Sequence, residues 1–392
     1  MTGCVLLVTL CLVLSLCGCK NGLTPESIRA IGRGSIQVSS TPTGAVVWLD
    51  AVGTGETTDC SLDSVPVGDH QLTLKLAGKL DWGETVSVVA GQTVAVACPL
   101  LPREVGFCDT LGNARGVAVS GSFAYVANSA VDLRVIDVSS SQSPYEIGCC
   151  ITPGNARGVA VSGSFAYVAD NTRGLRVIDV GNPHGPYEAG YCDTPGYAAG
   201  VAVSGSIVCV ADYAGGLRVI DVSSSPSPSE VGYCDTPGYA SGVTMSGNFA
   251  YVADDAEGLR VIDVSNPQSP HEAGHCDTPG NARGVAASGN FAYVADGGLG
   301  LRVIDVSNPQ NPYEAGYCDT PGTAYGVAVS GGFAYVADGE AGLRVIDVSN
   351  PQSPYEAGYC ETPGTAHGVA VSGSFVYVAD NLTGLRVIQV AR

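Results

Sequence analysis

The sequence predicts an all-β protein in which a seven-bladed β-propeller follows a small β-sandwich-like domain. From Arg103 onward the chain repeats one phrase seven times at a fixed spacing of 42 residues, most clearly in 313–354. A period in the low forties with several short strands per unit is typical of a propeller blade. Helical repeats would show apolar residues every 3.6 positions, and these repeats do not.

Each repeat contains four short runs that favour strands, for example 326–331, 333–338, 343–349 and 355–361. Val, Ile, Tyr and Phe dominate the runs, while Gly, Pro, Asn, Asp and Ser fill the gaps between them. The first three runs are almost continuously apolar. This composition suits a sheet that is buried on both faces between two neighbouring blades.

The series of repeats neither begins at the first strand of a blade nor ends at the fourth. The first repeat begins at a fourth strand, 103–108, and the last one stops after a third strand, 385–390. Pairing of these two segments would complete the last blade and leave no unpaired edge. We therefore expect residues 102–392 to form a monomeric propeller that is closed by its own termini.

The recurring LRVIDVSNPQSP, which follows GVAVSG and FAYVAD, resembles the LVIVD-repeat family of propellers over residues 103–392. Arginine stands at the second position of the family phrase in every copy, from Arg134 to Arg386. The resemblance implies a propeller of the cell surface or envelope. It implies no single activity.

Residues 34–101 differ from the repeats, because apolar and polar positions alternate, as in SIQVSS and HQLTLKL. Such alternation predicts strands with one buried face. The turn PTGA at 42–45, before VVWLD, resembles that of the PEGA domain, a small envelope-associated β module. A domain of this size has a marginal core, which a disulfide between Cys60 and Cys98 would support.

The N-terminus reads as an export signal. Residues 1–19 are apolar from Val5 onward but too short to span a bilayer comfortably. Their end, LCGC, resembles a bacterial lipoprotein cleavage box, which implies lipidation of Cys19; a plain signal peptide is the alternative. Polar residues 20–33 would form a tether. We expect an exported protein of the cell envelope, lipid-anchored at the outer membrane or cell surface, or else periplasmic or secreted.

The charge of the chain limits its partners. The formal net charge is −19, from 37 acidic and 18 basic side chains. Such a chain repels nucleic acids and anionic membrane surfaces. We expect no nucleic-acid partner, and membrane contact only through a lipid anchor.

Two motifs suggest chemistry that the predicted fold does not support. His271–His275 match the HExxH zinc motif, but both imidazoles reach one metal only from a helix, and this segment is predicted to be a strand. Seven of the 15 cysteines occupy one repeat position, and neighbouring blades hold them farther apart than the roughly 7 Å that a disulfide allows. We expect them to be small buried apolar residues, with a redox role as the alternative. They are Cys108, Cys150, Cys192, Cys234, Cys276, Cys318 and Cys360.

A series of acidic residues is a weak candidate for a metal site. One Asp closes the second strand of every blade except the first, where Asn128 stands. These carboxylates could hold Ca²⁺, or each could cap its own turn or pair with the arginine of its blade. No other cofactor is indicated. The series is Asp170, Asp212, Asp254, Asp296, Asp338 and Asp380.

Differences between the repeats are concentrated in two loops, one before GVAV and one after VAD. Both loops lie on the same face of an up-and-down blade, so the variation predicts a binding face on a uniform scaffold. Unselected drift in tolerant loops is the alternative. The candidate binding residues, rich in the Arg and Tyr of recognition surfaces, are Arg115, Arg157, Tyr197, Tyr239, Arg283, Tyr325 and His367.

The sequence specifies no catalytic constellation. We therefore expect a binding or scaffold protein whose partner is a protein or an envelope glycan. Two alternatives stay open. One is a metal-assisted hydrolase or lactonase that uses the Asp series, with His367 as a base. The other is a structural envelope component that assembles with its own copies.

Overall fold

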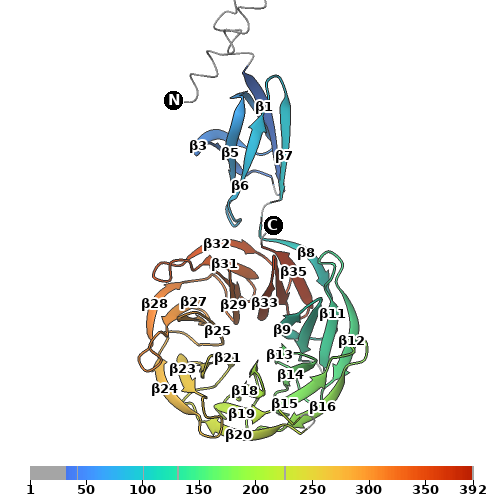
Figure 1. The fold of residues 1–392 in the computed structure, drawn as a ribbon, viewed down its shortest axis with the longest axis vertical. Helices are drawn as coiled ribbons and strands as arrows, with labels where there is room; N and C mark the ends of the chain where they lie inside the picture. The colour runs from blue at the N-terminus through green and yellow to red at the C-terminus, as the bar shows by residue number, and fades with distance from the viewer. Residues whose placement is uncertain (1–31, 42, 100, 130–131, 225–226, 391–392) are drawn as a thin grey trace, which may run out of the picture. The chain divides into compact units, whose positions relative to one another are not determined.

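The computed structural model describes residues 32–41, 43–99, 101–129, 132–224 and 227–390 (Figure 1). These residues form two compact units that divide at residue 100, except that Ala77–Leu80 group with the second unit. The regular elements of the described chain are 35 strands. No helix among these residues has the length and apolarity needed to cross a membrane. The leader with Cys19, and nearly all of the tether, lie outside the described residues.

The first unit contains two sheets. One has the order β4-β1-β7, in which β1 pairs antiparallel with β4 and parallel with β7. The other has the order β3-β2-β5-β6 and is antiparallel throughout. The strands are β1 (Arg33–Thr41), β2 (Val46–Leu49), β3 (Val52–Thr57), β4 (Cys60–Pro66), β5 (Gly68–Lys75), β6 (Trp82–Val88) and β7 (Thr93–Pro99).

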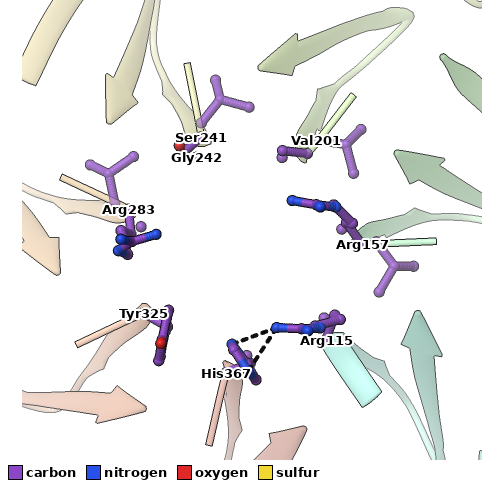
Figure 2. Close-up of a pocket in the computed structure, with 18 of the residues that line it drawn as sticks. Arg115, Arg157, Val201, Ser241, Gly242, Arg283, Tyr325 and His367 are labelled. Atoms are coloured by element: carbon purple, nitrogen blue, oxygen red, sulfur yellow. Dashed lines mark hydrogen bonds between the residues drawn. The ribbon is translucent and has the colours of Figure 1, made fainter. Parts of the chain in front are cut away.

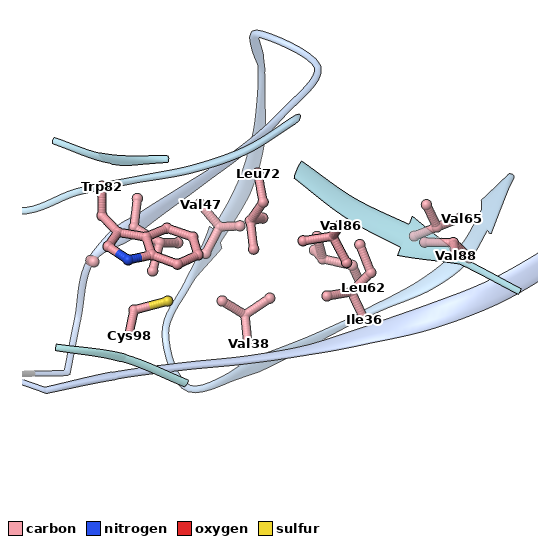
Figure 3. Packing of buried hydrophobic residues seen from close by; sticks show 12 residues of the cluster. Ile36, Val38, Val47, Leu62, Val65, Leu72, Trp82, Val86, Val88 and Cys98 are labelled. Atoms are coloured by element: carbon pink, nitrogen blue, oxygen red, sulfur yellow. The ribbon is translucent and has the colours of Figure 1, made fainter. Parts of the chain in front are cut away.

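Alternation along these strands creates the core of the first unit, because every second side chain points to the same face. Ile36 and Val38 of β1 are fully buried, as are Leu72 and Leu74 of β5. They join Trp82 of β6 in one apolar cluster (Figure 3). The predicted small all-β domain therefore has a single hydrophobic core.

The disulfide expected between Cys60 and Cys98 is not formed. Strand β1 lies between the two strands that carry them, since Val38 pairs with Cys60 and Ser40 pairs with Cys98. Two strand spacings separate the cysteine backbones by roughly 10 Å, and a disulfide requires less than about 7 Å. Cys98 instead packs into the apolar core.

The second unit consists of seven four-stranded antiparallel sheets arranged as a ring of blades (Figure 1). In each blade the first strand lies innermost and the fourth outermost. Six blades follow chain order, whereas the seventh takes its outer strand β8 (Arg103–Cys108) from the start of the unit, where Leu385 pairs with Cys108.

The strands of the first four blades are β9 (Ala114–Ser120), β10 (Phe123–Asn128), β11 (Asp132–Asp137), β12 (Tyr145–Ile151), β13 (Gly158–Ser162), β14 (Phe165–Ala169), β15 (Leu175–Asp179), β16 (Tyr187–Cys192), β17 (Gly200–Ser204), β18 (Ile207–Ala211), β19 (Leu217–Asp221), β20 (Ser229–Cys234), β21 (Gly242–Ser246), β22 (Phe249–Ala253), β23 (Leu259–Asp263) and β24 (His271–Cys276). The last three blades contain β25 (Gly284–Ser288), β26 (Phe291–Ala295), β27 (Leu301–Asp305), β28 (Tyr313–Cys318), β29 (Gly326–Ser330), β30 (Phe333–Ala337), β31 (Leu343–Asp347), β32 (Tyr355–Cys360), β33 (Gly368–Ser372), β34 (Phe375–Ala379) and β35 (Leu385–Gln389).

The hydrophobic core of this unit lies between blades. Tyr167 and Leu175 of the second blade pack against Val208 and Ile220 of the third, and equivalent clusters fill the other interfaces. This packing explains why the second and third strands are apolar at consecutive positions: each of their faces meets a neighbouring blade.

Glycine allows the innermost strands to approach one another. A Cβ added to Gly200 would lie 2.9 Å from the Cα of Gly242, and a Cβ on Gly242 would lie 2.7 Å from the carbonyl oxygen of Arg283. Backbone atoms of the next blade lie this close at all seven equivalent positions, so any side chain there would push the blades apart. These glycines are Gly116, Gly158, Gly200, Gly242, Gly284, Gly326 and Gly368.

Candidate functional site

A cavity of about 350 Å³ lies where the seven innermost strands begin (Figure 2). Each blade contributes the glycine just described, the valine after it and the residue before it, and the third blade also contributes Tyr213. The backbone is therefore the same around the cavity, and chemical identity comes from the residue before each glycine. These residues are Arg115, Arg157, Ala199, Ser241, Arg283, Tyr325 and His367.

The structure brings together five of the seven predicted binding residues. Their shared feature is their place immediately before a glycine of the innermost strands. Tyr197 and Tyr239 stand two positions earlier than the lining residues of their blades and do not line the cavity. Both are exposed. The five residues at the cavity are Arg115, Arg157, Arg283, Tyr325 and His367.

The two variable loops meet at the boundary between blades. Asn171, which follows the second strand of one blade, and Ala198, which precedes the first strand of the next, exchange two backbone hydrogen bonds of 3.0 Å. Similar bridges occur at five other boundaries. We call the residues on either side of these bridged alanines and of Ala156, together with the residue that follows Asn128 and each member of the Asp series, the variable rim.

The sequence-based list of binding residues misses the small lining residues Ala199 and Ser241 and the aromatic residue Tyr213. Tyr213 follows Asp212, the residue directly after the second strand β18, and has a φ of 51°, a left-handed conformation that is unfavourable for a bulky side chain. Its ring lies 6.3 Å from that of Tyr197 and 6.1 Å from that of Tyr239, between centroids. The signal in the sequence is that five of the six other blades place Asn, Asp or Gly here, all of which tolerate this conformation: Asn171, Asp255, Gly297, Gly339 and Asn381.

We expect substitutions at this left-handed position to show that the backbone of Tyr213 is strained. Tyr213→Asn should leave the free energy of unfolding unchanged or raise it by about 1 kcal/mol, because the strain relieved offsets the lost ring contacts. The reciprocal change Asn381→Tyr should lower the free energy of unfolding by about 1–2 kcal/mol. Chemical denaturation of both variants measures this. A clear loss of stability in Tyr213→Asn would show that the tyrosine serves the fold.

Each arginine of the cavity lies against an aromatic ring. Arg115 donates from Nη1 to Nε2 of His367 at 2.8 Å, and Arg157 donates to the hydroxyl oxygen of Tyr213 at 3.3 Å. The Arg283 guanidinium stacks 5.5 Å from the ring centroid of Tyr325, a cation–π contact. All three guanidiniums are thus positioned by neutral groups.

His367 is held in its neutral form. Burial, followed by the charges of Arg115, Arg283 and Arg157, lowers its pKa from 6.5 to about 4. Since the unfolded chain binds this proton from pH 6.5 downward, the contribution of neutral His367 to folding stability is complete above pH 6.5 and is lost as the pH falls towards 4.

A titration of His367 by NMR should therefore give a midpoint near pH 4. Arg115→Gln is expected to raise that midpoint by up to about one unit, because a nearby positive charge is removed. Arg173→Gln, in a loop that does not line the cavity, serves as the control and should leave it unchanged. A wild-type midpoint near 6.5 would contradict the described position of the imidazole.

The Asp series stabilises the fold and does not line the cavity. Asp212 is fully buried. Its Oδ1 accepts from the Thr194 hydroxyl at 2.5 Å and its Oδ2 from the Gly196 N–H at 2.7 Å, with Nε of Arg218 at 3.8 Å. Both oxygens are therefore engaged. No cluster of three or more His, Cys, Asp or Glu residues suited to a metal occurs in the part of the chain that the structure describes.

The same arrangement recurs at Asp170, Asp254, Asp296, Asp338 and Asp380. In the first blade Asn128 takes the place of the Asp and donates to the carbonyl oxygen of Leu111. There Arg134 pairs instead with Asp132, at 2.5 Å. Of the two interpretations left open by the sequence, the geometry favours turn capping and pairing with arginine over Ca²⁺ binding.

The HExxH segment lies on strand β24, as predicted. His271 pairs across the sheet with Asp263, while His275 pairs with Arg260. Nδ1 of His275 lies 3.0 Å from Glu272. The seven repeat cysteines are free thiols.

Family models match both units of the chain. Seven consecutive matches to the LVIVD repeat cover residues 111–152, 153–194, 195–236, 237–278, 279–320, 321–362 and 363–390. The chain belongs to the LVIVD-repeat family. Residues 33–104 of this LVIVD-repeat protein match the PEGA domain, so the resemblances to the LVIVD repeat and to the PEGA domain are confirmed.

Solved structures share the fold of this LVIVD-repeat protein at low sequence identity. The WD40 repeats of RRP9 cover 72% of the chain and 96% of their own, with a TM-score of 0.59 and 11% identity. The WD40 domain of Neurospora crassa Pan2 covers 72% and 90%, with a TM-score of 0.56 and 14% identity. The computationally designed protein Ika8 covers 91% and 100%, with a TM-score of 0.53 and 10% identity. No curated protein matches the sequence.

Proposed function

We propose that this LVIVD-repeat protein is a non-catalytic binding protein whose variable rim holds a partner. The observation that carries the proposal is the position of the variation. Seven nearly identical blades differ mainly at the rim, and the residue before each inner-strand glycine faces one shared cavity. A surface that varies on an otherwise uniform scaffold is the usual arrangement of a recognition site.

The scaffold prepares the rim for binding. The bridged alanines are fully buried, and backbone hydrogen bonds tie each rim loop to the next blade. Loops held in this way lose little conformational freedom when a partner binds, which lowers the entropic cost of association.

The proposal includes export and anchoring. The lipoprotein-type leader supports attachment through a lipid on Cys19, and the partner would then be a protein or a glycan of the envelope. Cells that express the full chain should incorporate labelled palmitate into the wild type and Cys17→Ala but not into Cys19→Ala. Equal labelling of all three, or of none, would contradict the anchor.

Capture from the native cell envelope tests the binding role. The rim variant, Arg115→Gln with Arg157→Gln and Arg283→Gln, is compared with a far-face variant, Ser122→Glu with Ser164→Glu and Asn290→Glu. The far-face changes lie in the turns after the first strands of the same three blades, and both variants change the net charge by the same amount.

The wild type and the far-face variant should capture one partner that the rim variant loses. Equal capture by all three would show that the rim does not bind. Capture of nothing, or only of further copies of the chain, would also overturn the proposal and would favour a structural role.

A further inference from the structure

The cavity at the variable rim is positively charged in a protein that is strongly acidic overall. Its lining includes Arg115, Arg157 and Arg283 but no Asp or Glu, although the chain has 37 acidic and 18 basic side chains. Three cations around a cavity of about 350 Å³ attract anions, and the low-dielectric walls strengthen that attraction.

These three arginines differ from those inside the blades. Each repeated arginine on a third strand has carboxylate partners, as Arg302 has Asp296 at 3.5 Å and Asp319 at 3.2 Å. Among the residues that the structure describes, the guanidiniums of the cavity form no ion pair, and their hydrogen bonds and cation–π contacts are with His367, Tyr213 and Tyr325. Their charge is therefore not neutralised within the protein.

The electrostatic consequence is visible at Arg115. Burial and the neighbouring charge of Arg157 lower the pKa of its guanidinium. Burial and the charges of Arg115, Arg283 and Arg157 lower the pKa of the nearby His367 imidazole, which accepts a hydrogen bond from Arg115. A bound anion would relieve the repulsion, and guanidinium forks suit the paired oxygens of carboxylates and phosphates.

Aromatic rings surround the charged site. Tyr213 and Tyr325 line the cavity, while Tyr197 and Tyr239 lie exposed beside Tyr213. Tyrosine offers an apolar face with a polar tip, which suits a sugar ring better than a bare ion. The cavity has the size of a small-molecule site, so a folded protein cannot fill it.

We propose that the variable rim binds an anionic sugar residue, with the three arginines on its carboxylate or phosphate and the tyrosines against its ring. This inference rests on the proposed binding function and specifies its ligand. The sugar could be free or could end a longer chain, and the chemistry of recognition is the same in both cases.

Calorimetric titration of the full chain tests the inference. The probes are glucuronate, glucose 6-phosphate, neutral glucose, inorganic phosphate, an oligogalacturonate and an acidic peptide. The wild type and the far-face variant should bind at least one of the acidic sugars and more tightly than glucose, inorganic phosphate or the peptide. The rim variant should bind that sugar about 100-fold more weakly, because three charged donors are lost. A preference for the oligogalacturonate would identify a chain as the source of the sugar.

No binding of any acidic sugar, equal binding by the rim variant, or tighter binding of the peptide would each overturn the inference. Rim-dependent capture from the envelope without binding of acidic sugars would reject this ligand but keep the binding function. Acidic-sugar binding without rim-dependent capture would support this ligand but reject the proposed capture of an envelope partner.

Discussion

Asp212→Ala is expected to lower the free energy of unfolding by about 3–5 kcal/mol. The change leaves the hydroxyl of Thr194 and the N–H of Gly196 without their acceptor. It also removes the fully buried carboxylate beside Arg218, whose other carboxylate partners, Glu230 and Asp235, are more exposed. Each buried polar group that loses its hydrogen-bond partner lowers the free energy of unfolding. The largest decrease comes from a buried charge that loses a partner. Denaturant unfolding of the full chain measures the difference.

Asp221→Ala is the matched control, because it changes the same residue type in the same blade. Asp221 lies near the surface, where it accepts a hydrogen bond from the N–H of Ser223 at 2.7 Å, so its loss should destabilise the protein much less than the loss of Asp212. Similar costs for the two variants would mean that the buried Asp series does not stabilise the blades as described.

Gly242→Ala is expected to destabilise the propeller by about 1–3 kcal/mol through overpacking. The added methyl group would lie 2.7 Å from the carbonyl oxygen of Arg283 and 3.0 Å from the Cα of Gly284. Both are backbone atoms of the next blade, which cannot rotate away as a side chain could. Thermal and denaturant unfolding should both report the loss.

Gly298→Ala provides the comparison, since a Cβ at Gly298 meets nothing within 4 Å. This variant should remain within about 0.5 kcal/mol of the wild type. If Gly242→Ala were equally harmless, the close approach of the innermost strands would not define the ring.

Repetition made the propeller predictable from sequence. Seven copies fix the number of blades, and the phase of the copies predicted the pairing of 103–108 with 385–390 that β8 and β35 form. The position of the rim could also be predicted, because loop order in an up-and-down blade follows from chain order. Five of the seven predicted binding residues line the cavity for this reason.

Other features could not be predicted, because they depend on distances between segments that are far apart in the sequence. The failure of the Cys60–Cys98 disulfide follows from a sheet order, β4-β1-β7, that alternation of apolar residues cannot reveal. Tyr197 and Arg157 looked equivalent as variable residues, yet only the residue next to the glycine reaches the cavity. Tyr213 belongs to the third blade but pairs with Ala240 at the start of the fourth. This contact between blades brings its ring to the cavity, and the sequence of one repeat does not reveal it.

Site-specific photo-crosslinking in cells tests the central claim, that the variable rim is the working face. The photoreactive p-benzoylphenylalanine replaces either Tyr197 on the rim or Tyr313 at the start of a fourth strand. These tyrosines are 53% and 54% exposed, so access to the solvent is matched. We expect a crosslinked partner from position 197 and none from position 313. A partner crosslinked from 313 alone, or equally from both, would contradict the account.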